Sequence, residues 1–408
     1  MILDLFAGPG GWSQALTVLG VRDVGLEWDE WACKTRAAAG QLTICTDVAA
    51  YPLWPFLGRI TGLIASPPCQ AWSMAGKRLG LVDQPLVHQA VADLAKGLDT
   101  REQLLAACRD PRSLLAAEPM RYLHALRQRG QPEWVAMEEV PDVLPLWRQY
   151  AAILRTWGYS AWTGILNAAD YGVPQTRRRA ILLASQTRTA EPPPPTHAKL
   201  AEPESLFGPG RARWVSMAEA LGWGATDRPV PTVCAGGGPG GGPEPFPSGS
   251  RKTLSDARDR GSWKPHPPAK STVAGAEGRA EKPVSAAQAT PTVWRWTLRS
   301  NNQANATVRT IDEPAGTLFF GHRANECVWQ AEPTSSTPPG TVAAPDPIRI
   351  TAAEAGILQT FPADYPWQGN KGQIFSQVGN AVPPRLAAHL LAPHLGKTLT
   401  PNDFTLAA

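Results

Sequence analysis

The sequence has few cysteines, and no two of them have the spacing of a metal site. The six are Cys33, Cys45, Cys69, Cys108, Cys234 and Cys327, with no Cys-x-x-Cys pair. This pattern argues against a disulfide framework and a zinc site, so we expect no metal and a reduced, cytoplasmic setting. Long apolar runs are also missing, so we expect no membrane contact. The first glycine loop begins at Gly8, and we therefore expect no signal peptide.

Charge is scarce as well. Only 18% of the 408 residues are charged and the net charge is +4, whereas 43% are hydrophobic. This composition supports a folded core and argues against a disordered chain. Because the net charge is small, any surface that binds nucleic acid must be a local patch. The length favours two domains.

The amino-terminal segment has the pattern of a cofactor-binding strand and turn. Residues 1–6 are predicted to form a buried strand and residues 12–19 a helix, with Gly8, Gly10 and Gly11 between them. Strand, glycine turn and helix together form a common nucleotide site, although a glycine loop alone is a weak signal. The glycine fingerprint of a dinucleotide site is missing, so a nucleoside cofactor fits better.

Acidic residues follow the next two predicted strands. Glu27 follows residues 21–26, where a carboxylate is placed to accept hydrogen bonds from ribose hydroxyls. Trp28 beside it offers a flat face to an adenine ring. Asp47 follows residues 42–45 and is placed to accept from an exocyclic amine. Each acid has an ordinary alternative role as a helix cap or a first-turn charge.

Cys69 follows a predicted buried strand over residues 60–65 and the stiff pair Pro67-Pro68. The carboxyl ends of strands in an open α/β sheet are where ligands bind. A lone cysteine is more commonly a small buried apolar residue. On this stretch alone both interpretations stay open.

The remaining elements suggest one domain interrupted by another. The pattern is helical through residues 85–130, with breaks expected at Pro85, Asp99-Thr100 and Asp110-Pro111, and a loop is expected over residues 71–77. The later predictions are a strand at 133–137, a helix at 141–157, strands at 159–166 and 180–184, a linker at 191–195, a short helix at 213–223, a capping box at Thr351–Glu354 and a last helix ending near Leu391. We expect a catalytic domain over 1–185, a linker and second domain over 186–345, and a segment over 346–400 that completes the first domain.

At this point the chain resembles the DNA (cytosine-5) methyltransferase family. The motifs that carry the resemblance are, in chain order, Asp4-Leu5-Phe6-Ala7-Gly8-Pro9-Gly10-Gly11, Glu27-Trp28, Asp47-Val48, Pro67-Pro68-Cys69-Gln70, Glu138-Glu139-Val140, Gln175 with Arg177 and Arg179, and Gln377-Val378-Gly379-Asn380. The resemblance implies an α/β, Rossmann-like fold of S-adenosylmethionine-dependent methyltransferases, with a mostly parallel sheet. It also implies a smaller, irregular, β-rich target recognition domain.

The resemblance also implies an activity, which is methyl transfer to carbon 5 of a flipped cytosine in double-stranded DNA. Cys69 would add to the base as a thiolate, and Glu138 would donate a proton to it. Arg179 would contact the base carbonyl, and Arg177 would bind phosphate or brace the loop. The implied contacts of S-adenosylmethionine are Asp4, Phe6, Ala7, Gly8, Gly10, Gly11, Glu27, Trp28, Asp47, Val48, Pro68 and Asn380. A monomer acting on DNA, in a bacterial or phage-infected cytoplasm, would suit this activity, and a restriction-modification system is one setting for it.

Three features depart from the family pattern. Glu139 stands where the family usually has asparagine, the stretch between Cys69 and Glu138 is long, and little precedes the first strand. In the second domain, candidate DNA contacts are Arg295, Arg299, Arg309 and Arg323, each of which has ordinary surface charge as an equal alternative.

Three other functions remain open. They are an RNA cytosine methyltransferase, a DNA-binding protein that has kept only the fold, and a nicotinamide-dependent dehydrogenase. The last of these leaves Pro-Cys-Gln and Gln-x-Arg-x-Arg unexplained.

Overall fold

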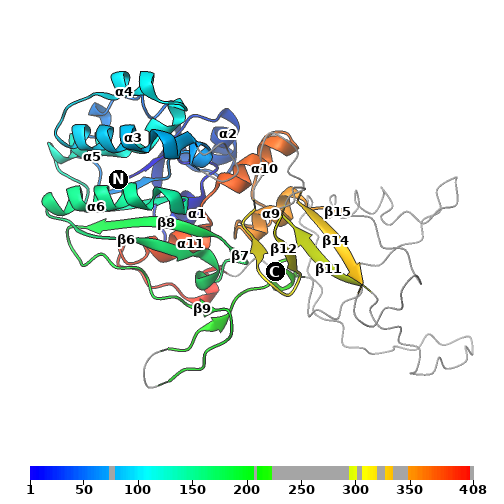
Figure 1. Ribbon diagram of the computed structural model, residues 1–408. Coiled ribbons are helices and arrows are strands. Elements are labelled where there is room, and N and C mark those ends of the chain that lie inside the picture. The colour runs from blue at the N-terminus through cyan, green and yellow to red at the C-terminus, as the bar shows by residue number, and fades with distance from the viewer. Residues whose placement is uncertain are drawn as a thin grey trace, which may run out of the picture.

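The computed structural model describes residues 1–72, 79–205, 209–222, 294–300, 306–318, 327–333 and 348–404 (Figure 1). Several predictions concern residues outside these ranges. They include most of the loop expected over 71–77, the greater part of the second domain, and Arg323.

The largest sheet in the described part of the chain has seven strands in the order β3-β2-β1-β4-β5-β8-β6. Their bounds are β1 (Ile2–Leu5), β2 (Asp23–Glu27), β3 (Leu42–Cys45), β4 (Gly62–Ala65), β5 (Trp134–Glu139), β6 (Ser160–Asn167) and β8 (Arg178–Ser185). The strands from β3 to β5 are parallel, and β8 is antiparallel to both of its neighbours. Every residue of β1, β4 and β5 is buried, as expected of strands covered on both faces. The predicted α/β fold with a mostly parallel sheet is confirmed.

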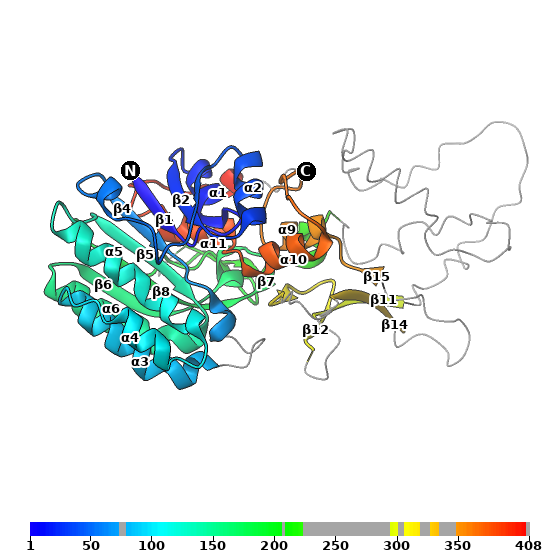
Figure 2. The same ribbon diagram turned by 90° about the horizontal axis from the view of Figure 1, so that it is seen from above.

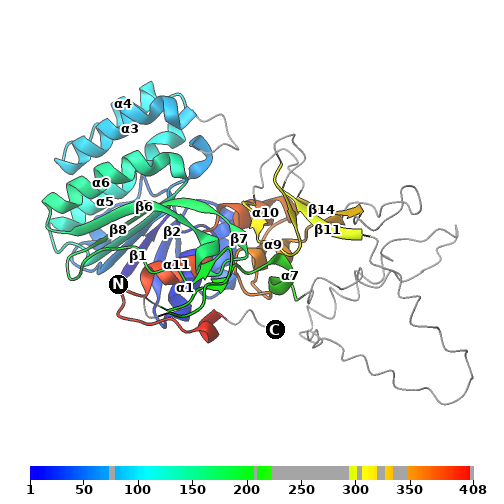
Figure 3. The ribbon, with the colours of Figure 1, turned by 60° about the horizontal axis from the view of Figure 1, so that its bottom comes forward.

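Helices cover both faces of this sheet (Figure 3). Their bounds are α1 (Gly11–Val18), α2 (Glu30–Ala38), α3 (Leu79–Ala95), α4 (Arg101–Ala107), α5 (Glu118–Arg127), α6 (Leu144–Thr156) and α11 (Pro384–Leu391). Because side chains alternate along a strand, Leu63 faces the core formed with α3, α5 and α6. Its neighbour Ile64 faces the core formed with α1 and α11. The segment that contains α11 therefore packs against the main sheet, although it is far from the strands of that sheet in the sequence.

A smaller antiparallel sheet lies beside the first one (Figure 2). It has the order β12-β11-β14-β15, with β11 (Trp294–Arg299), β12 (Val308–Thr310), β14 (Val328–Pro333) and β15 (Ile348–Arg349). Leu298 and Trp329 from this sheet pack in one core with α7 (Met217–Ala220), α9 (Ala352–Leu358) and α10 (Lys371–Asn380). Three further strands are short, namely β9 (His197–Ala198) and β10 (Ala212–Arg213), which pair with each other, and β13 (Ala315–Gly316). The last of these pairs with β7 (Gln175–Thr176), next to the arginine motif.

Most predicted elements are present, with some corrections. The predicted helix break at Pro85 is wrong, because α3 continues through this residue. Val87 and Val91 of the same helix are buried in the core. The helix expected over 213–223 is only α7, whose Ser216 forms a capping box with Glu219. The capping box at Thr351 is confirmed. No helix among the described residues is both long enough and apolar enough to cross a membrane.

Candidate active site

Cys69 lies at the carboxyl edge of the main sheet. It begins the short 3-10 helix η2 (Cys69–Ala71), which follows β4 and the pair Pro67-Pro68. Pro68 has an extended backbone, so the chain leaves the strand without a helical turn until Cys69. Ser66 accepts a hydrogen bond from the Trp12 indole at 2.9 Å, which ties this segment to α1. The thiol is therefore held on a stiff, partly buried turn.

Glu138, Arg177 and Arg179 come together from two antiparallel strands and the turn before one of them. The Nε of Arg179 lies 2.9 Å from the Oε1 of Glu138, and Nη2 of Arg177 lies 3.9 Å from the same oxygen. All three side chains are at least nine-tenths buried. Arg177 also donates to the Gly379 carbonyl at 3.0 Å, which links this cluster to the end of α10. The ion pair is therefore largely shielded from solvent.

Glu139 is the next residue on β5, and its side chain faces the other side of the sheet from Glu138. It is 1% exposed. One carboxyl oxygen accepts the Val140 N–H, and the other is buried without a hydrogen-bond partner. Burial, followed by the charge of Glu138, raises the pKa of Glu139 well above its ordinary value. The carboxyl of Glu139 therefore favours its protonated form.

The thiol of Cys69 is influenced by all four of these groups. Burial is the main reason that the pKa of Cys69 rises to about 12, and Glu139 is the largest contributor among the charges. Arg179 and Arg177 lower the pKa of Cys69 but do not offset these effects. The thiol form is therefore favoured in the free protein.

The glycine loop adopts the backbone that a close approach to a ligand requires. Phe6, Gly8 and Gly10 all have positive φ, at 60°, 54° and 97°. A side chain on Gly8 would meet nothing within 4 Å, so the loop is open there. At Gly11 an added Cβ would come within 2.1 Å of the Val382 carbonyl, which is why α11 can pack against α1 only with glycine at this position.

The acids after β2 and β3 are oriented by backbone donors. The Gly8 N–H and the Asp29 N–H each donate to Glu27 at 2.7 Å, so its carboxylate spans the glycine loop and the start of α2. Trp28 beside it is 71% exposed, which leaves its ring face open to a ligand. Asp47 accepts from the Ala49 N–H at 2.8 Å. These three side chains and the open loop fit an adenosine group.

The other candidate cofactor residues are placed less uniformly. Val48 and Ala7 are buried at 2% and 3% exposure. Asp4 is fully buried, neither of its oxygens has a hydrogen-bond partner, and burial raises its pKa well above the ordinary value. Asn380 ends α10 and its side chain is exposed. Asp4 therefore lies inside the sheet, below the loop surface.

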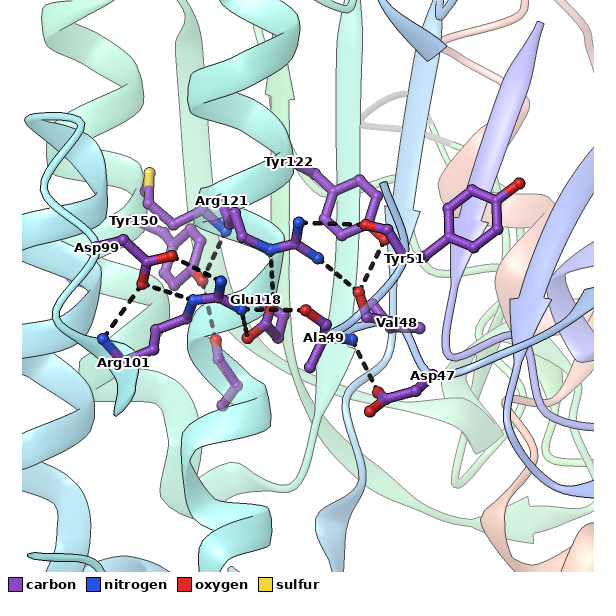
Figure 4. Close-up of polar contacts among 12 residues, drawn as sticks. Asp47, Val48, Ala49, Tyr51, Asp99, Arg101, Glu118, Arg121, Tyr122 and Tyr150 are labelled. Atoms are coloured by element: carbon purple, nitrogen blue, oxygen red, sulfur yellow. Dashed lines mark hydrogen bonds and ion pairs between the residues drawn. The ribbon is translucent and has the colours of Figure 1, made fainter. Parts of the chain in front are cut away.

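A polar network holds the loop that follows β3 (Figure 4). Arg121 donates to the Val48 carbonyl at 2.6 Å, and Arg101 donates to the Ala49 carbonyl at 3.2 Å. The two arginines share Glu118, which accepts from them at 2.8 and 2.6 Å. No sequence motif pointed to these residues. The spacing of Glu118 and Arg121 on one helix was visible, but their contact with residues 48–51 depends on tertiary packing.

Three of the four candidate DNA contacts, Arg295, Arg299 and Arg309, lie on the smaller sheet. Arg295 pairs with Asp312, and Arg309 lies 3.4 Å from the Glu313 carboxylate. Arg299 is half-buried at the end of β11. No group of three or more histidine, cysteine or carboxylate side chains suited to a metal ion occurs among the residues that the structure describes.

Comparison with known proteins identifies relatives along nearly the whole chain. The model of the family described as C-5 cytosine-specific DNA methylase matches residues 1–92 and 105–395. Type II methyltransferase M.DdeI from Desulfomicrobium norvegicum is 25% identical over 95% of this chain and 87% of its own length. Type II methyltransferase M.PspPI from a Psychrobacter species is 24% identical over 95% of this chain and 76% of its own. The crystal structure of the S. pombe Dnmt2 methyltransferase shares the fold with a TM-score of 0.51 and 12% identity, over 97% of this chain and 98% of that one. Residues 93–104 separate the two matched ranges and contain Arg101.

Proposed function

This chain belongs to the C-5 cytosine-specific DNA methylase family, and within that activity we propose that Cys69 is the nucleophile and Glu138 the proton donor. The protein is a DNA (cytosine-5) methyltransferase. The observation that carries the assignment is the buried Glu138–Arg179 pair, at 2.9 Å, at the same strand edge as the Cys69 turn.

These residue types suit the chemistry of cytosine. Carbon 5 of the base is a poor nucleophile until a thiolate adds to carbon 6, when the new S–C bond pushes the electron pair toward carbon 5 and the nitrogen 3 side of the ring. A carboxyl group that donates a proton at nitrogen 3 neutralises the charge that develops there. Carbon 5 would then take the methyl group from the donor's sulfonium sulfur, which would leave as a neutral thioether. Removal of the carbon 5 proton would return the electron pair to the ring and expel the Cys69 thiolate. Arg179, which touches Glu138, is placed to hold the base carbonyl and the carboxyl together.

The high pKa of Cys69 has a consequence for the order of events. Because burial favours the thiol in the free protein, attack requires that the proton leave when the base enters. Arg177 and Arg179 both lower the pKa of Cys69, so they favour the thiolate once the flipped base has displaced water from the site. Base flipping itself costs a few kcal/mol, which binding to the DNA backbone must supply.

The cofactor is S-adenosylmethionine, which supplies an electrophilic methyl group when it is bound. We propose that Glu27 accepts from its ribose hydroxyls, Trp28 and Phe6 flank its adenine, and Asp47 accepts from the adenine amine. The open backbone at Gly8 and the exposed ring of Trp28 support this placement. Ala7, Gly10, Gly11, Val48, Pro68 and Asn380 would line the same groove, and the buried Asp4 would act by organising the loop.

We further propose that residues 1–185 and 346–400 form the catalytic domain and that 186–345 contain the target recognition domain. Three of the four strands of the smaller antiparallel sheet lie in this second region, and β15 lies in the segment that follows it. Arg295, Arg299, Arg309 and Arg323 remain proposed DNA contacts there, and the first and third must loosen an acidic partner to reach phosphate. The protein is proposed to act as a monomer on duplex DNA in the cytoplasm.

Bisulfite sequencing of DNA from cells that express the chain tests this function, with Cys69→Ala as the matched control. Conversion-resistant cytosines at one recurring sequence, present only with the wild-type chain, would support it. Purified protein that methylates transfer RNA but leaves duplex DNA unmodified would overturn the DNA assignment.

A further inference from the structure

The loop after β3 is held in place by side chains that do not themselves reach the cofactor groove. Its residues 48, 49 and 51 all present carbonyl oxygens to α4 and α5. Arg121 donates to Val48 at 2.6 Å and to Tyr51 at 3.3 Å, and the Tyr122 hydroxyl donates to Val48 at 2.9 Å. Three donors from one helix on one short loop determine its position closely (Figure 4).

This arrangement acts on Asp47 through a single peptide group. The Val48 carbonyl, which accepts from Arg121 and Tyr122, belongs to the same planar peptide as the Ala49 N–H. That N–H donates to the Asp47 carboxylate at 2.8 Å. Fixing the oxygen end of the peptide therefore fixes the direction of its N–H, and so the orientation of the carboxylate.

Glu118 joins the two arginines. Its side chain is 4% exposed, and its two oxygens accept from Arg101 at 2.6 Å and Arg121 at 2.8 Å. Arg101 also donates to the Ala49 carbonyl, and Asp99 pairs with it on the outer side. A buried carboxylate between two guanidinium groups keeps both of them in one geometry.

The same residues enclose a cleft beside Asp47. It has a volume of about 590 Å³, and its walls include Asp47, Ala49, Arg101, Arg112, Leu105 and Glu118. Phe6, Glu27 and Trp28 are not among the residues that line it.

We propose that Arg121, Glu118 and the inserted Arg101 are positioning residues, which hold Asp47 in the orientation that recognises the adenine amine of the methyl donor. This inference rests on the proposed function, because it requires adenine at Asp47. The network contacts neither the donor nor the target base. It acts on donor affinity, and above all on the discrimination between adenine and a base that lacks the amine.

The two test variants are chosen so that the buried Glu118 keeps one arginine partner. Arg121→Ala leaves Glu118 paired with Arg101, and Arg101→Ala leaves it paired with Arg121. Arg112→Ala is the matched control. Arg112 lines the same cleft, but its guanidinium pairs with Asp110, and its side chain is 54% exposed. Asp47→Ala removes the proposed amine acceptor itself.

The measurement is calorimetric binding of S-adenosylhomocysteine and of its inosine analogue, in which a carbonyl replaces the adenine amine. We expect the wild-type chain to prefer the adenine form by at least about tenfold, since one hydrogen bond to a charged group is lost in the analogue. Arg121→Ala should lose most of this preference, Arg101→Ala should lose part of it, and Arg112→Ala should keep it. The kcat at saturating donor should change little while KM for the donor rises, and thermal melting checks that each variant is folded.

Any other binding result overturns either the positioning role, the placement of adenine at Asp47, or both. If the arginine variants bind both ligands more weakly by the same factor, or bind as the wild type does, the positioning role is overturned. If Asp47→Ala loses the preference while Arg121→Ala and Arg101→Ala keep it, the adenine site stands and only this inference fails. If Asp47→Ala keeps the wild-type preference, or the wild type has none, adenine does not lie at Asp47, and both the site assignment and the inference fail.

Discussion

Glu139 offers a direct test of the electrostatics of this site. Its carboxyl is buried, one of its oxygens has no partner, and burial together with Glu138 raises its pKa. Leaving a polar atom buried and unpaired costs about 1–3 kcal/mol. The charged form would cost more, because it would be buried and would be repelled by the nearby charge of Glu138. We therefore expect Glu139→Gln to be folded and to become more stable than the wild type as the pH rises.

The sign follows from proton linkage. A carboxyl with a higher pKa in the folded chain than in the unfolded chain holds its proton more tightly when folded. The stability that the protonated carboxyl contributes to the folded chain is fully present below the ordinary glutamate pKa. It is lost as the pH rises through the pKa that the carboxyl has in the folded chain. Within that window the unfolding free energy of the wild type should fall, relative to Glu139→Gln, by about 1.4 kcal/mol per pH unit. Glutamine does not titrate, so the unfolding free energy of the variant does not fall for this reason.

Urea unfolding followed by tryptophan fluorescence, from about pH 5.5 to 7.5, measures the difference. Glu102→Gln, which removes an exposed carboxyl on α4, is the control and should run parallel to the wild type. A constant difference between wild type and Glu139→Gln across this range would refute the reasoning. The reasoning would also be refuted if the wild type gained stability relative to Glu139→Gln as the pH rises.

Two further predictions concern activity. Cys69→Ala should lower the rate of methyl transfer by more than about 10⁴-fold. It should leave the affinity for S-adenosylhomocysteine unchanged, because the thiol lies outside the glycine loop. A variant that remains substantially active in a methyl-transfer assay would contradict the covalent mechanism. Glu139→Asn should stay active in the same assay, since an amide oxygen can accept the Val140 N–H as the carboxyl does and the Glu138–Arg179 pair is untouched; an inactive variant would mean that the second acid takes part in the chemistry.

Much of the main sheet was predictable because its strands are short and apolar, and several of them are buried on both faces. The segments β1, β3 and β4 were each placed to within a few residues by that pattern. The position of β8 between β5 and β6, antiparallel to both, was not predictable, because hydrophobic periodicity contains no information on strand order. This order matters, since it aligns Arg179 with Leu166 and places it beside Glu138.

The site was predictable as a set of motifs but not as a geometry. The order of the motifs indicated the family, and that prediction is confirmed. The individual roles of Cys69, Glu138, Arg177 and Arg179 remain predictions. The opposite facing of Glu138 and Glu139 follows from strand alternation and could have been anticipated. The network around Glu118 could not, because Arg101 belongs to an inserted stretch and its partners at residues 48–51 are far away in the sequence.

Covalent trapping tests the central claim most directly. Duplex DNA containing 5-fluorocytosine at the target position has no proton on carbon 5 to remove, so a covalent adduct cannot resolve once methyl transfer has occurred. In the presence of S-adenosylmethionine we predict a denaturant-stable protein–DNA complex that mass spectrometry maps to the peptide containing Cys69, and no complex with Cys69→Ala. No complex with the wild-type chain, or attachment at another cysteine such as Cys108, would contradict the account.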